Sequence, residues 1–380
     1  MTRLVGVDAA RALALLGMVA AHLLDRRTAT GEVDAWFQLV AGRSSALFAV
    51  LAGVSLVLAS RPRPGGPSVA AHRVRIVVRA AAVAVLGLVL GAYAEGIAVI
   101  LTYYGVLFLL GVPVLRWRAR SLLLLALAWG LVTPALSMLL RPRLPSPTYQ
   151  VPNPTSLADP WQLLTELLVT GYYPVLTWGT YLFAGMGVAR LGLGSTRTAR
   201  ALLLHGTLTA AAALAVHRWV LTLDGVRESL ATSLGMPAAP WEEVDRVLRE
   251  GAYGTTPTDT WWWLGVWSPH TGSWVDLAHT TAFAVAVLAA TTLLVEGGGR
   301  RVRRVVQVAL GAGAMTLTLY AAHVTVVALP PSWGWTRHLG VHLLGLLLVG
   351  AVFGWRGRRG PLETGVATLA EAVAPRRPPG

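Results

Sequence analysis

The sequence predicts an all-α, polytopic membrane protein: a bundle of about ten transmembrane helices with the N-terminus and the C-terminus in the cytoplasm. Two observations predict this class. Hydrophobic residues make up 54% of the 380 residues and charged residues only 13%, and the mean hydropathy is +0.58. Apolar runs of about 20 residues, the length that crosses a bilayer as a helix, recur along the whole chain.

Polar breaks divide these apolar runs into ten predicted spans. They are 4–24, 36–60, 74–94, 97–115, 121–140, 164–189, 200–220, 274–295, 305–329 and 338–355. The first run is interrupted by Asp8 and Arg11 and is followed by other spans, so we expect an uncleaved helix rather than a signal peptide. We therefore expect one membrane domain, 1–356, and a basic, partly disordered cytoplasmic tail, 357–380.

Two connecting segments are longer than turns. Residues 141–163 are rich in proline, and 221–273 form a polar insert in which EEVDRVLRE is a predicted short helix and WWWLGVWSPHTGSW closes the segment. Eleven of the 15 tryptophans fall on the side of these segments. An interfacial aromatic belt explains that distribution, and so does a stacking surface for a ligand outside the membrane.

The distribution of arginines predicts the orientation of the chain in the membrane. The 32 basic residues are all arginines, in short clusters between apolar runs, which is typical of orientation signals and not of nucleic-acid binding. Fourteen lie in short loops on one side, at 61–75, 116–120, 190–200 and 300–304, and five lie in short loops on the other. The positive-inside rule places the fourteen, and both ends of the chain, in the cytoplasm of a multi-pass plasma-membrane protein.

Some functions are excluded or disfavoured. The chain has no cysteine, which excludes disulfides, zinc–thiolate sites and thiol nucleophiles. An HxxxH spacing occurs only at His338 and His342 and lacks the glutamate of HExxH, so we expect no metal site. We assign these two, with His72 and His205, to polar interfaces near helix ends. No internal repeat is visible, which disfavours transporters built from inverted repeats.

The first span carries three ionisable residues on one face. With about 100° of rotation per residue, Asp8, Arg11 and His22 all point the same way, and Arg11 and His22 are about 16 Å apart along the axis. A charge near the middle of a span costs about 2.5–3.5 kcal/mol, so two of them in one helix indicate a function. The alternative is that Asp8 and Arg11 simply pair at the interface.

Further candidates fall at two depths. In the outer half, near the depth of His22, lie Arg43 of the second span and Tyr320 and His323 of the ninth, with Asp276 and His279 as a second possible pair. At the inner end of the third span, Arg75 and Arg79 are i,i+4 neighbours at the depth of Arg11. Guanidinium groups with few carboxylates nearby favour an anionic ligand from the cytoplasm, phosphates above all, although the positive-inside rule also explains them.

Five segments in order resemble a known family. RLVGVDAARALALLGMVAAH resembles the first-span signature of integral membrane acyltransferases, in which an Arg is followed by ten residues and a His, usually with an Asp three before the Arg. The matching residues are Asp8, Arg11 and His22. GRSSALFAVLAGVSL, YYPVLTWGTYLFAGMGVARLG, AMTLTLYAAH and RRGPLE follow, and are similar to the YeiB-like branch, which is related to heparan-alpha-glucosaminide N-acetyltransferase.

The resemblance implies a transmembrane acyltransferase. Such a protein takes an acyl group, expected to be acetyl, from acyl-CoA in the cytoplasm and passes it to an extracytoplasmic glycan or glycolipid. It also implies that His22 is catalytic and that Arg11, with Arg75 and Arg79, holds CoA. From depth, we expect Arg43, Tyr320 or His323 to stabilise the oxyanion, and Asp8 to belong to the same catalytic stripe.

Some alternatives stay open at the level of sequence. A neutral imidazole at His22 can take a proton from the acceptor or carry the acyl group itself. Intramembrane His and Arg are equally typical of a transporter or proton-coupled carrier, and a non-catalytic sensor or export partner would keep the same fold. An oligomer is also compatible with the sequence.

Overall fold

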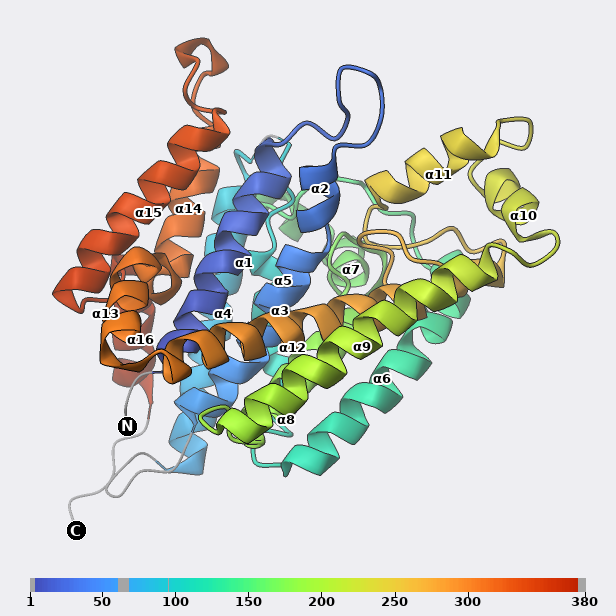
Figure 1. Cartoon of the computed structure of the whole chain (residues 1–380). Coiled ribbons are helices and arrows are strands. Elements are labelled where there is room, and N and C mark those ends of the chain that lie inside the picture. Colours follow the sequence, from blue (N-terminus) through green and yellow to red (C-terminus); the bar gives the residue numbers. More distant parts are fainter. Residues whose placement is uncertain (1–3, 61–67, 95, 375–380) are drawn as a thin grey trace.

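The computed structural model describes residues 4–60, 68–94 and 96–374, and helices make up most of that part of the chain (Figure 1). Seven of the helical segments described are long and apolar enough to cross a membrane. They are α1 (Val5–Leu23), α2 with α3 (Ala35–Val40 and Arg43–Ala59), α4 (Val69–Gly91), α6 (Ala119–Leu140), α9 (Thr196–Val220), α12 (Trp274–Gly297) and α15 (Leu339–Arg356). The prediction of a polytopic, all-helical membrane protein is confirmed.

The other three predicted spans are short or broken. The run 97–115 contains only α5 (Leu101–Gly111), and 164–189 is divided between α7 (Pro160–Thr165), the π-helical turn Glu166–Thr170 and α8 (Val175–Arg190). Pro174 directly precedes α8 and lacks the N–H that a continuous helix needs. We expected one continuous span in each run, whereas α5 covers only part of the first run and the second is interrupted at 171–174.

The run 305–329 is broken for a packing reason. It contains α13 (Gly299–Ala309), the 3-10 turn Gly311–Ala314 and α14 (Thr316–Val327). At Gly313 an added Cβ would lie 1.7 Å from the backbone oxygen of Asp8, and at Gly311 it would lie 2.1 Å from that of Gly350. The glycine turn therefore lets α1 and α15 approach the backbone directly, and it sets the direction of α14.

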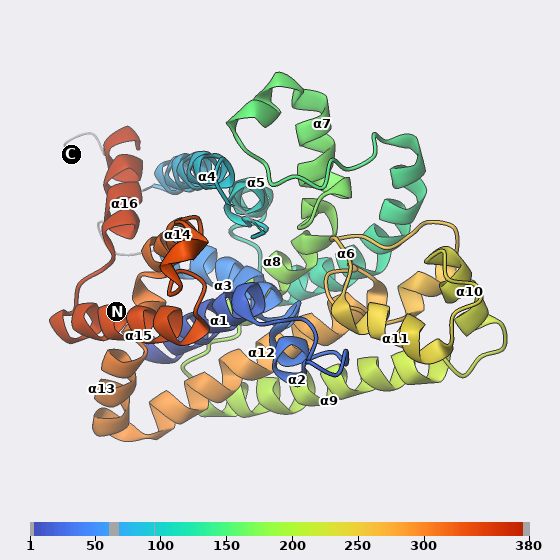
Figure 2. The ribbon, with the colours of Figure 1, turned by 90° about the horizontal axis from the view of Figure 1, so that it is seen from above.

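The helices form a bundle with α1 and α3 at its centre. Viewed from above, α14, α15 and α16 lie on one side of α1, and α9, α10 and α11 lie on the other (Figure 2). Helix α3 packs closely on α8 through glycines, because an added Cβ at Gly53 or Gly185 would overlap backbone oxygens of the facing helix.

Part of the predicted cytoplasmic tail, 357–380, is helical. Residues Pro361–Val373 form α16, which packs against α4 and α14. The carboxylate of Glu363 accepts hydrogen bonds from the backbone N–H groups of Leu317 (2.7 Å) and Thr318 (3.2 Å) and from the Thr318 hydroxyl (2.6 Å). The RRGPLE segment thus caps the start of α14, which is why it is ordered. Residues 375–380 lie outside the described part of the chain.

The polar insert 221–273 has its own small core. It contains α10 (Val226–Ser233), α11 (Trp241–Glu250) and the 3-10 turn Trp261–Gly265. Val226, Leu230, Leu248, Trp263 and Val266 are buried together there. The short helix predicted at EEVDRVLRE is confirmed as part of α11.

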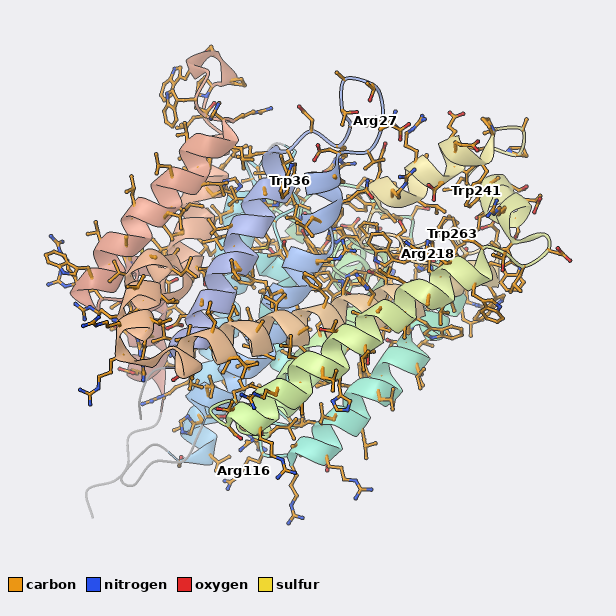
Figure 3. All side chains as sticks on the ribbon, viewed as in Figure 1. Arg27, Trp36, Arg116, Arg218, Trp241 and Trp263 are labelled. Carbon is orange, nitrogen blue, oxygen red and sulfur yellow. The ribbon has the colours of Figure 1, made fainter. Side chains whose placement is uncertain are left out.

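The two ends of the bundle differ in their side chains. Arg116 lies at the lower end in Figure 3, and Arg27, Trp36 and Trp241 lie at the upper end. The start of α1, the end of α15 and helix α16 share the lower end (Figure 1). The arginine distribution assigns that end to the cytoplasm, and this orientation stays a prediction. Arg61 and Arg63, which contribute to it, lie outside the described residues.

Candidate functional site

His22 lies in the last turn of α1, half-buried, and faces α14. Its Nδ1 is 3.1 Å from Nε2 of His323, and the two rings are stacked with centroids 5.3 Å apart. His323 is 1% exposed. The break at Gly311–Ala314 and the cap by Glu363 fix the start of α14, and His323 follows two turns later. Two residues that the sequence placed at the same depth are thus in direct contact.

His323 also contacts a third histidine. Its Nδ1 is 2.9 Å from Nδ1 of His342 on the first turn of α15, and Nε2 of His342 lies 2.8 Å from the backbone oxygen of Thr336. We call His22, His323, His342 and the Thr336 carbonyl the histidine chain. Our assignment of His342 to an ordinary polar interface near a helix end was therefore incomplete. Its depth in the span 338–355, which matches that of His323, was the signal that could have found it.

Tyr320 also lies against His22. The two rings meet edge to face with centroids 6.4 Å apart, and the backbone N–H of Ile100 donates to the Tyr320 hydroxyl at 3.4 Å. The structure thus brings together three of the predicted site residues, His22, His323 and Tyr320. Their individual roles stay predictions.

A residue that sequence reasoning missed, His270, approaches the histidine chain from the loop before α12. It has a left-handed backbone with φ of 61° and packs on the rings of Tyr172 and Tyr173, at 4.8 and 5.8 Å. Its Nδ1 is buried and has no hydrogen-bond partner among the described residues. Burial, followed by the charges of Arg26 and His22, lowers the pKa of His270 to about 3. It is therefore a neutral imidazole near pH 7.

Arg43 contacts α2, α12 and Trp267. Its Nε donates to Nε2 of His279 (3.0 Å), one amino group donates to the backbone oxygen of Gln38 (2.6 Å), and the guanidinium stacks 4.8 Å from the Trp267 ring. Nδ1 of His279 lies 3.0 Å from the carbonyl of Ala210. The described contacts of Arg43 therefore do not include His22. An oxyanion role at His22 gains no support from them.

The second outer pair that we considered, Asp276 with His279, does not appear among the described hydrogen bonds of either residue. Asp276 instead accepts from the backbone N–H of Gly272 at 3.0 Å, at the start of α12, where Ser273 caps the helix. His279 pairs with Arg43. The i,i+3 spacing placed the two residues on one helix face without bringing their polar atoms together.

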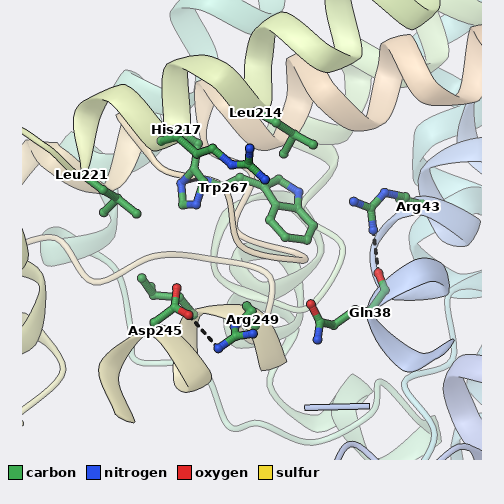
Figure 4. Close-up of a pocket in the computed structure, with 10 residues that line it drawn as sticks. Gln38, Arg43, Leu214, His217, Leu221, Asp245, Arg249 and Trp267 are labelled. Carbon is green, nitrogen blue, oxygen red and sulfur yellow. Dashed lines mark hydrogen bonds and ion pairs between the residues drawn. The ribbon is translucent and has the colours of Figure 1, made fainter. Parts of the chain in front are cut away.

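Arg43 also lines a pocket of about 390 Å³ (Figure 4). Trp267 forms an aromatic wall, Gln38 and Arg249 point into the space below it, and Asp245 holds Arg249 at 2.7 Å. Arg218 and His217 of α9 complete the polar lining. The pocket is cationic, and its aromatic wall, Trp267, precedes His270 by three residues in the chain.

At the inner level, Asp8 and Arg11 form an ion pair. One amino group of Arg11 is 2.8 Å from the Asp8 carboxylate, and the other donates to the Ser55 hydroxyl at 2.6 Å. Asp8 precedes His22 by 14 residues, about 21 Å along the helix, so it does not contact the imidazole. The pairing that we gave as the alternative is present. Asp8 orients Arg11 rather than His22.

Arg75 and Arg79 form a separate group on α4, apart from the contacts of Arg11. Both are half-buried, and the Nε of each is buried without a hydrogen-bond partner among the described residues. Arg359 of the tail and Glu371 of α16 lie close enough to interact electrostatically with Arg79. Three arginines thus face one glutamate between α4 and the tail. Sequence reasoning missed Arg359, which α16 brings there.

Within residues 4–60, 68–94 and 96–374, no group of three or more His, Asp or Glu side chains converges as a metal site. The three histidines are joined in a line, nitrogen to nitrogen, and do not surround a common point.

A comparison with protein families matches residues 3–222 to the family described as heparan-alpha-glucosaminide N-acetyltransferase, catalytic. The matched segment is more than half of the chain and contains His22, Arg11 and Arg79. A comparison with curated proteins finds no match. Helices α14, α15 and α16 lie beyond the matched segment, so the partners of His22 come from a region that the family match does not cover.

Proposed function

The chain belongs to the heparan-alpha-glucosaminide N-acetyltransferase catalytic-domain family, and from this premise we propose that it is an acyl-CoA-dependent acyltransferase of the plasma membrane. It moves an acyl group, acetyl in the first instance, from CoA in the cytoplasm to an extracytoplasmic glycan or glycolipid. The observation that supports this best is the contact of His22 with His323 at the end of α1 opposite the arginine-rich end.

His22 acts as the general base in this proposal. The imidazole takes the proton of the acceptor O–H or N–H while the acceptor atom bonds to the thioester carbonyl carbon. The C–S bond then breaks, and the CoA thiolate receives the proton from His22, so that atoms and charge balance. The ring of Tyr320 borders His22, which supports a contact of Tyr320 with the substrate near the reacting carbonyl in this proposal. An acyl-imidazole intermediate on His22 is the second route, and it would appear as acetylated enzyme when acceptor is withheld.

CoA phosphates bind between α4 and the tail in this proposal. The buried Nε atoms of Arg75 and Arg79 have no acceptor among the described residues, and phosphate oxygens would supply one. Arg359 adds a third positive charge. Arg11, held by Asp8 and Ser55, lies about 16 Å along α1 from His22, and the pantetheine arm would run along this stripe.

The acceptor binds at the opposite end. The cationic pocket with Trp267 as its wall suits a sugar ring, which stacks on an indole face while its polar groups meet Arg43, Arg249 and Gln38. The same segment brings His270 toward His22. A glycan lying along residues 267–270 would therefore reach from the pocket to the base.

A proton-coupled carrier is the second candidate function, because linked imidazoles in a membrane are typical of proton relays. The experiment that separates the two measures release of free CoA from acetyl-CoA by purified protein. A thiol reagent reads that release without background, since the chain has no cysteine. The acyltransferase proposal predicts CoA release that rises when amino-sugar oligosaccharides are added. Dissipation of a pH gradient by reconstituted protein, with no CoA release, would favour the carrier.

A further inference from the structure

The histidine chain ends on a group that can only accept a hydrogen bond. The backbone carbonyl of Thr336 has no proton to give, so Nε2 of His342, 2.8 Å away, is the donor. Thr336 is 0% exposed, which keeps water from competing for its carbonyl. One end of the chain therefore has a fixed direction.

The donor at His342 fixes which nitrogen donates and which accepts in all three rings. A neutral imidazole carries one proton, so His342, with its proton on Nε2, presents an acceptor at Nδ1. His323 must then donate from Nδ1 to His342, which leaves its own Nε2 as an acceptor. His22 in turn donates from Nδ1 to His323. Its remaining nitrogen, Nε2, is left with a free lone pair.

From this geometry we propose that His342 and the Thr336 carbonyl are positioning groups that hold His22 in the tautomer that makes Nε2 a base. The tautomer assignment stands on the contacts alone, and its use in proton transfer rests on the proposed function. Nε2 of His22 has no hydrogen-bond partner among residues 4–60, 68–94 and 96–374, and it is not one of the buried unpaired atoms. It is therefore open to a substrate.

Among the described residues, the hydrogen bonds of the histidine chain and the electrostatic contacts of His22 and His323 include no carboxylate. The ionisable groups that face it are Tyr320 on α14, His270 from the loop before α12, and, beyond His270, Arg26. In the familiar Ser-His-Asp arrangement a carboxylate sets the tautomer and balances the imidazolium. Here two further imidazoles and a carbonyl dipole take that place. When Nε2 of His22 gains a proton, the Nδ1 protons of His22 and His323 can each move one ring along, which carries the positive charge to His342.

The direct test is nitrogen NMR of the full-length protein labelled with ¹⁵N-histidine, at a pH where the imidazoles are neutral. The chain has nine histidines, and the signals of His22 are identified as those that a His22→Gln variant loses. We expect the proton of His22 on Nδ1. A proton on Nε2 of His22 in the unsubstituted protein would overturn the proposal, whether or not the protein proves to be an acyltransferase.

Two substitutions of His342 sharpen the test. His342→Leu removes the acceptor, so His323 can turn its proton toward His22, and the tautomer of His22 should become mixed. His342→Asn places a carbonyl oxygen near the position of Nδ1 and should preserve it. His338→Leu, one turn earlier and exposed, is the matched control. An unchanged His22 spectrum in a folded His342→Leu protein would overturn the proposal.

Steady-state kinetics of the His342 variants provide a second measurement. We expect kcat to fall by at least about tenfold in His342→Leu, within the roughly 10⁴-fold that a wrong tautomer costs a catalytic triad, while KM for acetyl-CoA stays constant. His342→Asn should recover most of the rate. Equal losses in the Leu and Asn variants would mean that His342 supports packing alone. If His342→Leu does not fold, the nitrogen NMR spectrum of the unsubstituted protein still tests the tautomer of His22.

Discussion

Two histidines in the outer half of the bundle use their ring nitrogens in opposite ways. His279 accepts from Arg43 at Nε2, and its Nδ1 meets the Ala210 carbonyl, so both nitrogens are committed. Within the described part of the chain, His22 has a hydrogen-bond partner at Nδ1, which is His323, and none at Nε2. Residue type and depth are the same in the two cases. What separates a reactive histidine from a structural one is whether a lone pair is left for a substrate.

The same substitution at both positions should therefore give opposite results, and this is the largest effect that we expect. His22→Leu should lower acetyl transfer by at least about 10²-fold, because it removes the general base. His279→Leu should leave kcat within a few-fold of the original value. The measurement is initial-rate CoA release by purified variants.

Folding must be shown to be intact in this pair of variants. Both should elute as monodisperse species in detergent at the position of the unsubstituted protein. Equal rates for His22→Leu and the unsubstituted protein would remove His22 from the chemistry. A 10²-fold loss in a folded His279→Leu variant would mean that the comparison assigns the wrong histidine.

A second prediction extends the comparison to Arg75 and Arg79, whose Nε atoms have no hydrogen-bond partner in the part of the chain that the structure describes. Arg79→Ala should raise KM for acetyl-CoA about tenfold with little change in kcat, since a charge-assisted contact to phosphate acts on binding. Arg79→Lys should recover only part of the affinity if the contact is bidentate. Arg73→Ala, on the same helix and exposed, is the control. Titration of CoA into the variants checks this, and equal affinities for Arg79→Ala and Arg73→Ala would contradict it.

A third prediction concerns stability. His279→Leu leaves the Nε of Arg43 without its acceptor in a half-buried position. The free energy of unfolding should fall by about 1–3 kcal/mol. Thermal unfolding in detergent measures the change as a lower Tm. The double variant Arg43→Leu with His279→Leu should regain part of the loss, because both polar partners are then removed. If His279→Leu has the same Tm as the unsubstituted protein, the Arg43–His279 hydrogen bond does not contribute to stability.

The smallest expected effect is the pH dependence from His270. Its pKa is lowered to about 3 in the folded protein from an ordinary value near 6.5, so the folded state binds fewer protons than the unfolded state between these values. The contribution of His270 to stability is then complete above about pH 6.5 and is lost as the pH falls toward 3. His270→Gln should reduce the loss of stability between pH 7 and pH 5 by an amount on the order of 1 kcal/mol. Identical pH profiles would contradict this.

The depth of residues within the predicted spans was enough to predict much of the site. A periodicity of about 3.6 residues and the span boundaries were enough to place His22, His323 and Tyr320 at one level, and the structure brings them together. The same reasoning applied to Arg43 did not bring it to His22, because depth fixes one coordinate only. The face that a helix turns to its neighbours depends on packing, and Arg43 faces α12.

Other features of the structure could not be predicted from residue types. The acceptor at the end of the histidine chain is a backbone carbonyl, which every residue has, and Thr336 is therefore invisible to a search for ionisable groups. The break before α14 follows from close contacts of Gly311 and Gly313 with α15 and α1, and the break before α8 follows from the missing N–H of Pro174. The tail is ordered because Glu363 caps α14, a contact between residues 45 or more apart in the chain.

The most direct test of the central claim follows an acetyl group across a membrane. Protein is reconstituted in sealed vesicles, and its orientation is read by a single cysteine placed in 221–273 and labelled with an impermeant maleimide. Radiolabelled acetyl-CoA is supplied to the face that carries the arginine-rich end, and a glycan acceptor is enclosed on the other. The account predicts labelled glycan in that compartment, and none with His22→Leu. Labelled glycan formed only when acetyl-CoA and the acceptor share one face, or undiminished labelling by His22→Leu, would contradict it.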